Sequence, residues 1–364
     1  RSDTGNPILK QKYTIESDAI VMRQALYRPR LLNEYKKKKL DVSAQYYLLQ
    51  NREEELKIRV IGNYLKLIKS LSTISLIERQ IELTKEEEII ADRSLKAGTG
   101  TITELVEIRA SLDKSRVALI SNEQNFKRAL NELSFLIGKS LKGFSYKVSD
   151  NPRFGALDVK TLKDWETESL EKNYQALQMR DQIESSKLSL KSEKYGKYPT
   201  LDLTVQVARG TSESTFFINS ETKTQSIGLT FYLPIFSGGS VVSRVKQAGF
   251  LLDAEIQKLA FEEEEILKKV QESYYGLNES IRLIEAIRVA IKSAKTEIDA
   301  NRKSVIAGLR RNLDVLTSQQ KLLRVETDLI DSTMGVILSW ANLNAYSGNL
   351  TAETIRKIET VISQ

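Results

Sequence analysis

The feature that most constrains this chain is an internal repeat, in which the second half follows the first at an offset of 210 residues. Ala97-Gly98 corresponds to Ala307-Gly308, and Gly138 corresponds to Gly348. A duplication that keeps one offset over such a length predicts two repeats of similar fold. We place the first repeat in residues 1–150 and the second in residues 151–364.

The repeat has the apolar spacing of coiled-coil helices. A 4-3-4-3 spacing occurs in both halves and places one apolar seam along each long helix. The seam residues are Val60, Tyr64, Leu67, Leu71 and Ile74 in the first half, and Val270, Tyr274, Leu277, Ile281 and Ile284 in the second. We predict long helices over 31–96 and 240–306, with return helices over 101–136 and 311–346. At 1.5 Å per residue each long helix extends about 100 Å, so each half forms a tall antiparallel hairpin.

The positions of the prolines are consistent with these predicted helices. A proline inside a helix costs about 3 kcal/mol, so long helices should lie between prolines. We expect all five to fall outside helical segments: Pro7, Pro29, Pro152, Pro199 and Pro234.

Residues 199–236 change from a helical to an alternating period, which predicts a β-hairpin with one apolar and one polar face. The apolar positions are Leu201, Leu203, Val205 and Val207, then Ile227, Leu229, Phe231, Leu233 and Ile235. A polar loop is expected over 209–223, and a third strand, with Ile20, Met22 and Leu26, over 13–27. Strands of about ten residues cross a bilayer in a barrel, where their apolar side chains face lipid.

Composition excludes several classes of function. The chain has no Cys and no His, which removes disulfides, thiolate metal sites and the commonest general base. No catalytic constellation, cofactor motif or metal site is present, so we expect no enzyme. The net charge is +7, but its one basic run, Lys36 to Lys39, lacks interleaved aromatic residues. We read that run as a solvated or interfacial helix face and expect no nucleic-acid partner.

Several segments resemble the TolC family of outer-membrane factors, over essentially the whole chain. They are YPTLDLTV, GLTFYLPIFSGGSVVSRVKQA, LKAGTGTITELVEIRASLDKSRVAL and ALYRPRLLNEY. Within that family, the LYRP segment and the turn GTGTITE look most like the branch that serves type I protein secretion. The resemblance implies a mainly α protein with a transmembrane β portion, whose hairpins form an α-barrel and whose strands join a shared trimeric β-barrel. It also implies a place in the outer membrane of a Gram-negative bacterium, extending into the periplasm.

The resemblance further implies partners and a channel tip. The partners are two more copies of the chain, outer-membrane lipid, a periplasmic adaptor and an inner-membrane exporter, most often of the ABC type. The tip residues are Gly98, Glu104, Gly308, Arg310, Arg311 and Asp314, where the carboxylates would form a charged ring and Arg310 would hold the tip closed. Alternatively, each carboxylate stabilises the N-terminus of its own helix. Two positions depart from the family pattern, because Thr317 stands for an acid and Val305 for a tyrosine.

Two further expectations come from the repeat and the family together. Residue 1 corresponds to residue 211, so the first half has no counterpart of residues 151–210, and we expect a signal peptide, a helix and a strand upstream of this sequence. Residues 150–164 and the tail after Gly348 match the family's equatorial collar. Alternative functions are multidrug or metal efflux through the same kind of channel and, more remotely, a soluble coiled-coil scaffold.

Overall fold

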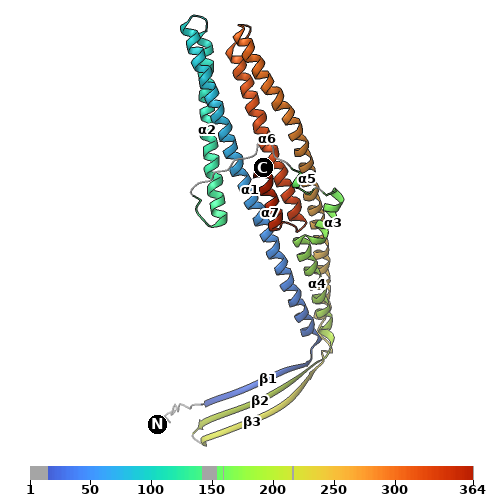
Figure 1. The fold of residues 1–364 in the computed structure, drawn as a ribbon. Coiled ribbons are helices and arrows are strands. Elements are labelled where there is room, and N and C mark those ends of the chain that lie inside the picture. The colour runs from blue at the N-terminus through green and yellow to red at the C-terminus, as the bar shows by residue number, and fades with distance from the viewer. Residues whose placement is uncertain (1–14, 142–153, 159, 215–216, 364) are drawn as a thin grey trace, which may run out of the picture. The chain divides into compact units, whose positions relative to one another are not determined.

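The computed structural model describes residues 15–141, 154–158, 160–214 and 217–363. Figure 1 shows the helices and strands in order. They are β1 (Ile15–Tyr27), α1 (Pro29–Lys96), α2 (Ile102–Ile137), α3 (Leu162–Lys172), α4 (Tyr174–Lys194), β2 (Thr200–Ser214), β3 (Phe217–Tyr232), α5 (Ser240–Ile306), α6 (Asn312–Tyr346) and α7 (Ala352–Ser363), with short 3-10 turns at 154–156 and 195–197.

The chain divides into two compact units. The strand unit contains the residues up to Ala44 together with Met179–Lys258, and the hairpin unit contains Gln45–Gln178 together with Leu259–Gln364. This division does not follow the two proposed repeats, because each unit takes segments from both halves. The order strand, long helix, return helix does occur twice, as β1, α1, α2 and as β3, α5, α6. The repeat boundary near residue 150 stays a prediction.

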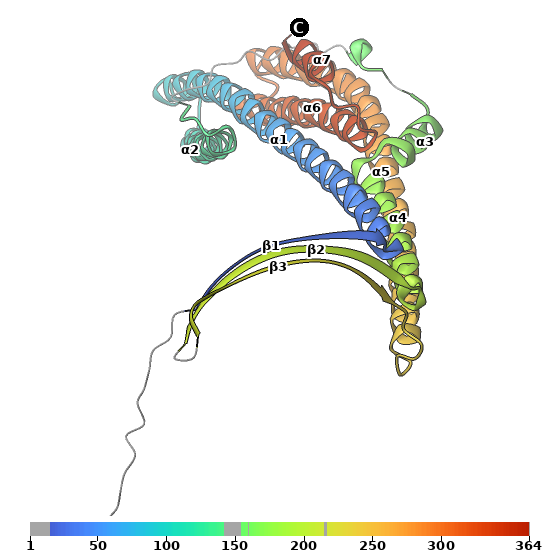
Figure 2. The same cartoon turned by 90° about the horizontal axis from the view of Figure 1, so that it is seen from below.

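The strand unit holds an antiparallel sheet in the order β1-β2-β3. The three strands curve side by side in Figure 2. The predicted polar loop over 209–223 is wrong: β2 continues to Ser214 and β3 begins at Phe217. Polar residues extend the ladder, with Gly210 opposite Thr222, because strand pairing uses backbone groups and does not require apolar side chains. The strands are therefore 15 and 16 residues long instead of about ten.

The helix boundaries agree with the sequence pattern to within two residues. The predicted helix over 240–306 matches α5, and the return helices shift by one residue. The exception is Pro29, which we expected outside the helices and which is the first residue of α1. Proline is tolerated at this position because the first amides of a helix have no intrahelical acceptor and its fixed φ suits the first turn. No helix in the described ranges is long and apolar enough to cross a membrane.

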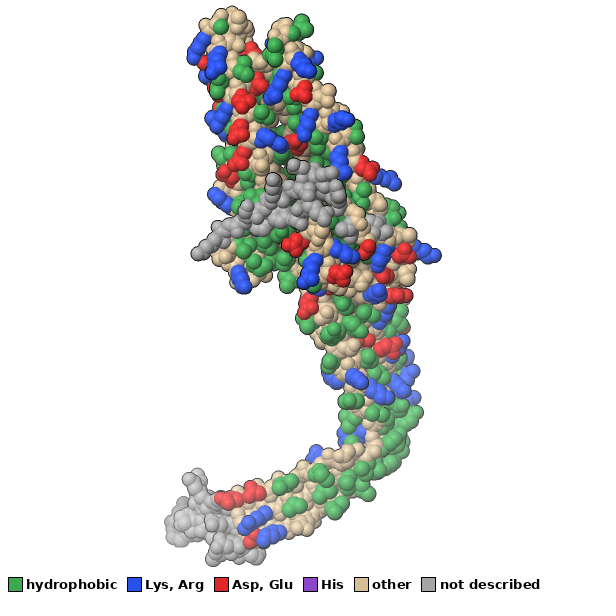
Figure 3. All heavy atoms as spheres, in the orientation of Figure 1, with side chains coloured by type: hydrophobic (Ala, Val, Ile, Leu, Met, Phe, Trp, Pro, Cys, Tyr) green, Lys and Arg blue, Asp and Glu red, His purple; other side chains and the backbone are tan. Residues whose placement is uncertain are grey.

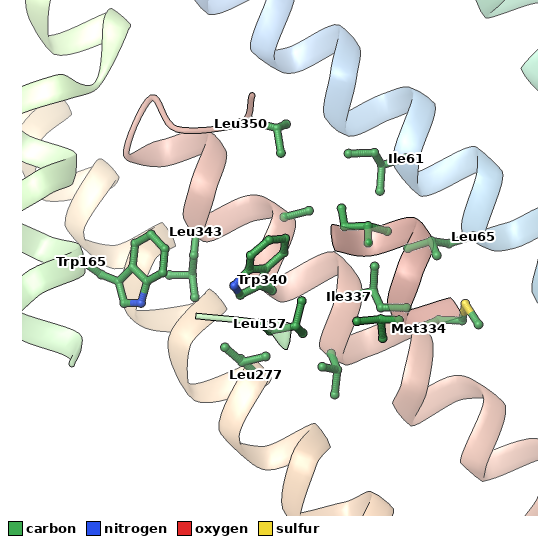
Figure 4. Close-up of a cluster of buried hydrophobic side chains, with 14 of the residues drawn as sticks. Ile61, Leu65, Leu157, Trp165, Leu277, Met334, Ile337, Trp340, Leu343 and Leu350 are labelled. Atoms are coloured by element: carbon green, nitrogen blue, oxygen red, sulfur yellow. The ribbon is translucent and has the colours of Figure 1, made fainter. Parts of the chain in front are cut away.

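The core of the hairpin unit lies along α1 and α6. One side of α1 carries the predicted seam, where Leu67 packs against Ala129 and Leu133 of α2. A second stripe on α1 was not predicted, with Ile61, Leu65 and Ile68 buried in the largest cluster. Figure 4 shows part of this cluster, with side chains from α1, α3, α5 and α6 around Trp340. Because α1 buries two adjacent stripes, it joins the two helical hairpins.

The tail and the segment before α3 pack against one part of this core, and their role as an equatorial collar stays a prediction. Leu350, Ile358 and Val361 belong to the same cluster as Leu157. The indole Nε1 of Trp340 donates a hydrogen bond to the Asp158 carbonyl oxygen at 3.2 Å. Lys357 of α7 pairs with the Asp158 carboxylate at 2.9 Å. Residues 150–153 and 159 of the predicted collar lie outside the described residues.

Candidate functional site

The sheet has one apolar and one polar face. Strand pairing places Leu203 opposite Leu229, and Leu201 opposite Phe231, so these side chains share a face. Val205 lies opposite Ile227. On the other face, polar residues meet polar or small ones: Asp202 with Thr230, Thr204 with Gly228, and Gln206 with Ser226. The alternation expected from the sequence is therefore correct in register across β2 and β3.

The apolar face is widely exposed on the single chain. Ile227, Leu229 and Phe231 are 78%, 66% and 65% exposed, and Val207 is 50% exposed. Leu201, Leu203 and Val205 are half-buried. A contiguous apolar surface of this kind marks a region that is covered by lipid or by another protein.

Two details of this face differ from the prediction. Leu233 and Ile235 follow the end of β3 at Tyr232, so neither is a strand residue. In β1, the pairing shifts between Ala25 and Tyr27, which leaves Leu26 at a β-bulge and brings Tyr27 opposite Leu201. Ile20 and Met22 keep the apolar face, opposite Val207 and Val205. The bulge could not be read from alternation alone.

The two turns at the ends of the hairpins have the same geometry. Gly98 and Gly308 have φ angles of +74° and +71°, in the left-handed region that favours glycine. The amides of Thr99 and Gly100 both donate to the Ser94 carbonyl. At the equivalent positions of the second turn, the amides of Leu309 and Arg310 both donate to the Ser304 carbonyl.

The predicted tip carboxylates bind backbone amides, but of different helices. The Asp314 carboxylate accepts a hydrogen bond at 3.2 Å from the amide of Arg311, at the N-terminus of its own helix, α6. The Glu104 carboxylate accepts one at 3.1 Å from the amide of Asn312, which begins α6 in the other hairpin. The amide of Glu104 itself is capped by the Thr101 hydroxyl. Glu104 therefore connects the two hairpins within one chain.

The arginines of the tip remain exposed. Among the described residues, neither Arg310 nor Arg311 forms an ion pair, and both side chains face solvent on the single chain. Thr317 is also exposed, and Val305 is half-buried. The proposed closing role of Arg310 therefore needs a partner from another molecule and stays a prediction.

Behind the tip lies a buried polar layer that the sequence analysis missed. Gln80, Thr84 and Glu87 of α1 are buried on a stripe that also includes the buried Ile77 and Ala91. Gln80 donates to Gln319 of α6 at 3.4 Å. Burial raises the pKa of the Glu87 carboxyl, and the nearby Arg302 opposes this shift. The signal was present in the sequence, because positions 77, 80, 84, 87 and 91 have a 3-4-3-4 spacing of their own, with polar residues between Ile77 and Ala91.

A groove lies beside this layer. It has a volume of about 300 Å³ and is lined by α1, α5 and α6, including Leu83, Ile298 and Leu322. The ion pair between Arg79 and Glu326, at 2.8 Å, crosses from α1 to α6 beside it. At the tip itself, the large apolar side chains of Ile306 and Leu309 are 87% and 80% exposed.

A sheet with an exposed apolar face, joined to helical hairpins far longer than a compact globule needs, defines the class of outer-membrane channel proteins. The comparison with protein families agrees, since the family described as outer membrane efflux protein matches residues 166–349. The chain therefore belongs to this family and is a protein of the outer membrane. The resemblance drawn from the sequence is confirmed.

Named relatives align over most of the chain. The alkaline protease secretion protein AprF of Pseudomonas aeruginosa is 24% identical and covers 90% of this chain, with 69% of its own length aligned. The proteases secretion protein PrtF of Dickeya chrysanthemi is 24% identical, over 98% of this chain and 78% of its own. The outer membrane protein TolC of Escherichia coli is 22% identical, over 86% of this chain and 66% of its own.

Solved structures confirm the fold. The outer membrane protein VceC of Vibrio cholerae superposes with a TM-score of 0.78 at 12% sequence identity, over 93% of this chain and 88% of its own. The fold class predicted from the sequence, long helical hairpins with a β portion, is thus correct.

Proposed function

We propose that this channel protein is the exit duct of a type I protein secretion system. The observation that carries the proposal is the alignment of two protease-secretion proteins over 90% and 98% of the chain. The proposed cargo is a polypeptide that passes through the duct without chemical change, so no catalytic step is required.

The sheet supports the proposal that several copies form the duct together. Within the described residues, β1 and β3 are the edges of the sheet. An unpaired edge in lipid leaves backbone groups without partners, at a cost of several kcal/mol each. Further strands must therefore pair with these edges, and we propose a trimer with a shared barrel. The face that carries Leu203 and Leu229 would contact lipid, and the face that carries Thr204 would line the water-filled lumen.

The tips support a proposal for the partners. Ile306 and Leu309 expose apolar surface at the second turn. A periplasmic adaptor with helical hairpins could bury this surface and so join the duct to an ABC-type exporter in the inner membrane. The tip carboxylates Glu104 and Asp314 would give the entrance a negative field that favours cations.

Secretion can be tested directly. The full-length protein should be expressed with an adaptor and an ABC exporter of the protease-secretion type, in a host that lacks its own outer-membrane duct. Protease in the medium supports the proposal, and its retention in the cells contradicts it. Leu309→Asp should abolish secretion while the oligomer persists. Thr99→Asp is the matched control, because it adds the same charge at the equivalent position of the other turn.

Drug or metal efflux is the second candidate, and the family description favours it. The same strains distinguish the two functions. Resistance to toxic compounds that is restored only with a proton-driven pump, without protease secretion, would identify an efflux duct.

A further inference from the structure

All three strands meet helices at one end of the sheet. Tyr27, the last residue of β1, lies opposite Leu201 at the start of β2, and Thr200 lies opposite Tyr232 at the end of β3. The adjoining helices are α1, α4 and α5, and the segments that follow or precede the strands lie in the strand unit.

These junction segments hold all of the net charge of the chain. Residues 28–44, 186–200 and 233–250 contain 12 basic and 3 acidic side chains, a net charge of +9, whereas the whole chain carries +7. The remaining residues therefore carry −2. Figure 3 shows blue side chains predominating over red ones on the helices next to the strands, whereas both colours mix along the helices of the hairpin unit. We call these three segments the basic collar. They are different residues from the predicted equatorial collar.

Arginines pair with most of the acidic groups of the collar region. Glu193 of α4 accepts hydrogen bonds from Arg30 at 3.2 Å and from Arg244 at 3.0 Å, and Arg28 pairs with Asp202. Asp41 is 3.6 Å from Lys38. These contacts connect α1, α4, α5 and β2, so the arginines have structural roles.

Seven lysines of the collar form no ion pair with any residue in the described part of the chain. They are Lys36, Lys37, Lys39, Lys191, Lys194, Lys197 and Lys246. All are exposed except Lys37, which is half-buried. Lys36 to Lys39 are consecutive on α1 and so span about 300° of the helix, which means that any face of α1 presents at least one of them. Like charges at this density repel one another unless a negative partner lies nearby.

Apolar side chains occur at the same junctions. Ile235 and Phe236, between β3 and α5, are 94% and 89% exposed, and Tyr198, before β2, is 49% exposed. Aromatic side chains flanking a transmembrane segment are typical of the depth at which lipid headgroups meet water.

We infer that the basic collar binds the phosphate groups of anionic phospholipids at the periplasmic surface of the outer membrane. The inference rests on the proposed placement of the sheet in lipid, because that placement puts the collar at headgroup depth. Lysines are suited to this role, because their flexible ammonium groups reach several phosphates without fixed geometry. Each lysine near an anionic surface adds to the attraction, and salt should weaken the interaction.

The test uses the full-length protein in detergent and counts retained lipids by native mass spectrometry. Dioleoylphosphatidylglycerol and dioleoylphosphatidylcholine are added in equal amounts. We expect the wild type to retain the anionic lipid with about tenfold preference, a value consistent with several lysines near an anionic surface. A variant with Lys36→Gln, Lys39→Gln, Lys194→Gln and Lys197→Gln should show almost no preference, and the four Lys→Arg changes should restore it.

The matched control removes the same charge from exposed lysines of the hairpin unit, as Lys85→Gln, Lys114→Gln, Lys127→Gln and Lys292→Gln. It should keep the wild-type preference. An equal loss in both variants would mean that net charge alone decides, and an unchanged preference in the collar variant would also overturn the inference. A shift of channel selectivity toward cations, with lipid preference unchanged, would place these lysines in the lumen. Protease secretion by the collar variant reports separately on the proposed function.

Discussion

Glu104 shows how one side chain can act on a helix to which it does not belong. Its carboxylate lies 3.1 Å from the amide of Asn312, the first residue of α6. That amide has no acceptor within its own helix, and the N-terminus of a helix carries a partial positive charge. Both effects favour a carboxylate at this place, so Glu104 should stabilise the contact between the two hairpins.

Glu104→Ala should therefore loosen the start of α6. We expect amide exchange at Asn312 to accelerate about fivefold, since the bond is worth about 1 kcal/mol. Hydrogen exchange read by mass spectrometry on peptides that cover the start of α6 measures this. Glu107→Ala, which removes an exposed carboxylate one turn further along α2, is the control. Equal exchange in both variants would show that the contact adds nothing to stability.

Glu87 makes the stability of the hairpin unit depend on pH. Burial raises the pKa of its carboxyl, so the folded protein binds a proton that the unfolded chain releases. The charged form therefore costs stability once the pH exceeds the ordinary glutamate pKa, and this cost grows until the raised pKa is passed.

Glu87→Gln should raise the melting temperature more at about pH 8 than at about pH 4, where most of the carboxyl is protonated in both the folded and the unfolded state. Thermal unfolding at the two pH values measures the difference. The neighbouring Glu86→Gln, at an exposed position, should have little effect. A gain that is the same at both pH values would contradict the assignment of the effect to ionisation of Glu87.

At the scale of the elements, charged substitutions on the two faces of the sheet test which face contacts lipid. Leu203 and Thr204 are neighbours on β2 and lie on opposite faces. Leu203→Arg should cost about 2–4 kcal/mol if this position lies near mid-bilayer, whereas Thr204→Arg should cost much less. The yield of oligomer extracted in detergent measures both. Similar losses at the two positions would refute a lipid-facing role for the apolar face.

The elements also show what the sequence could and could not predict. The end of α5 was predictable because Ala307-Gly308 follows it, and Gly308 adopts a left-handed φ. The lengths of β2 and β3 were not predictable, because most residues from 209 to 223 are polar and resemble a loop. The second buried stripe of α1 was missed because one seam per helix satisfied the pattern. The partner of Glu104 was missed because Asn312 is 208 residues away.

At the scale of the whole molecule, Arg310 raises the question of how the tips of several protomers are held together. It forms no ion pair with the described residues of its own chain, so a closing contact must involve another protomer. Charge-assisted hydrogen bonds are worth about 1.5–3 kcal/mol each, and three copies of such a contact could hold a tip closed.

Arg310→Ser should therefore raise the single-channel conductance of the full-length protein in planar bilayers. Replacing both Glu104 and Asp314 by Ala should instead reduce cation selectivity, because it removes the negative field at the tip. If neither conductance nor selectivity changes in these variants, the narrowest part of the channel lies elsewhere.

The pairing of β1 with β2 also sets an order of events during synthesis. Tyr27 pairs with Leu201, which is synthesised 174 residues later, so β1 and β2 cannot pair until then. Contacts between distant residues form late, because the intervening chain must first lose its freedom. The hairpin of α1 and α2 contains only nearer contacts and can form in the meantime. A nascent chain that stops before residue 200 would thus leave the edge of β1 that pairs with β2 unpaired, and unpaired strand edges are prone to aggregation.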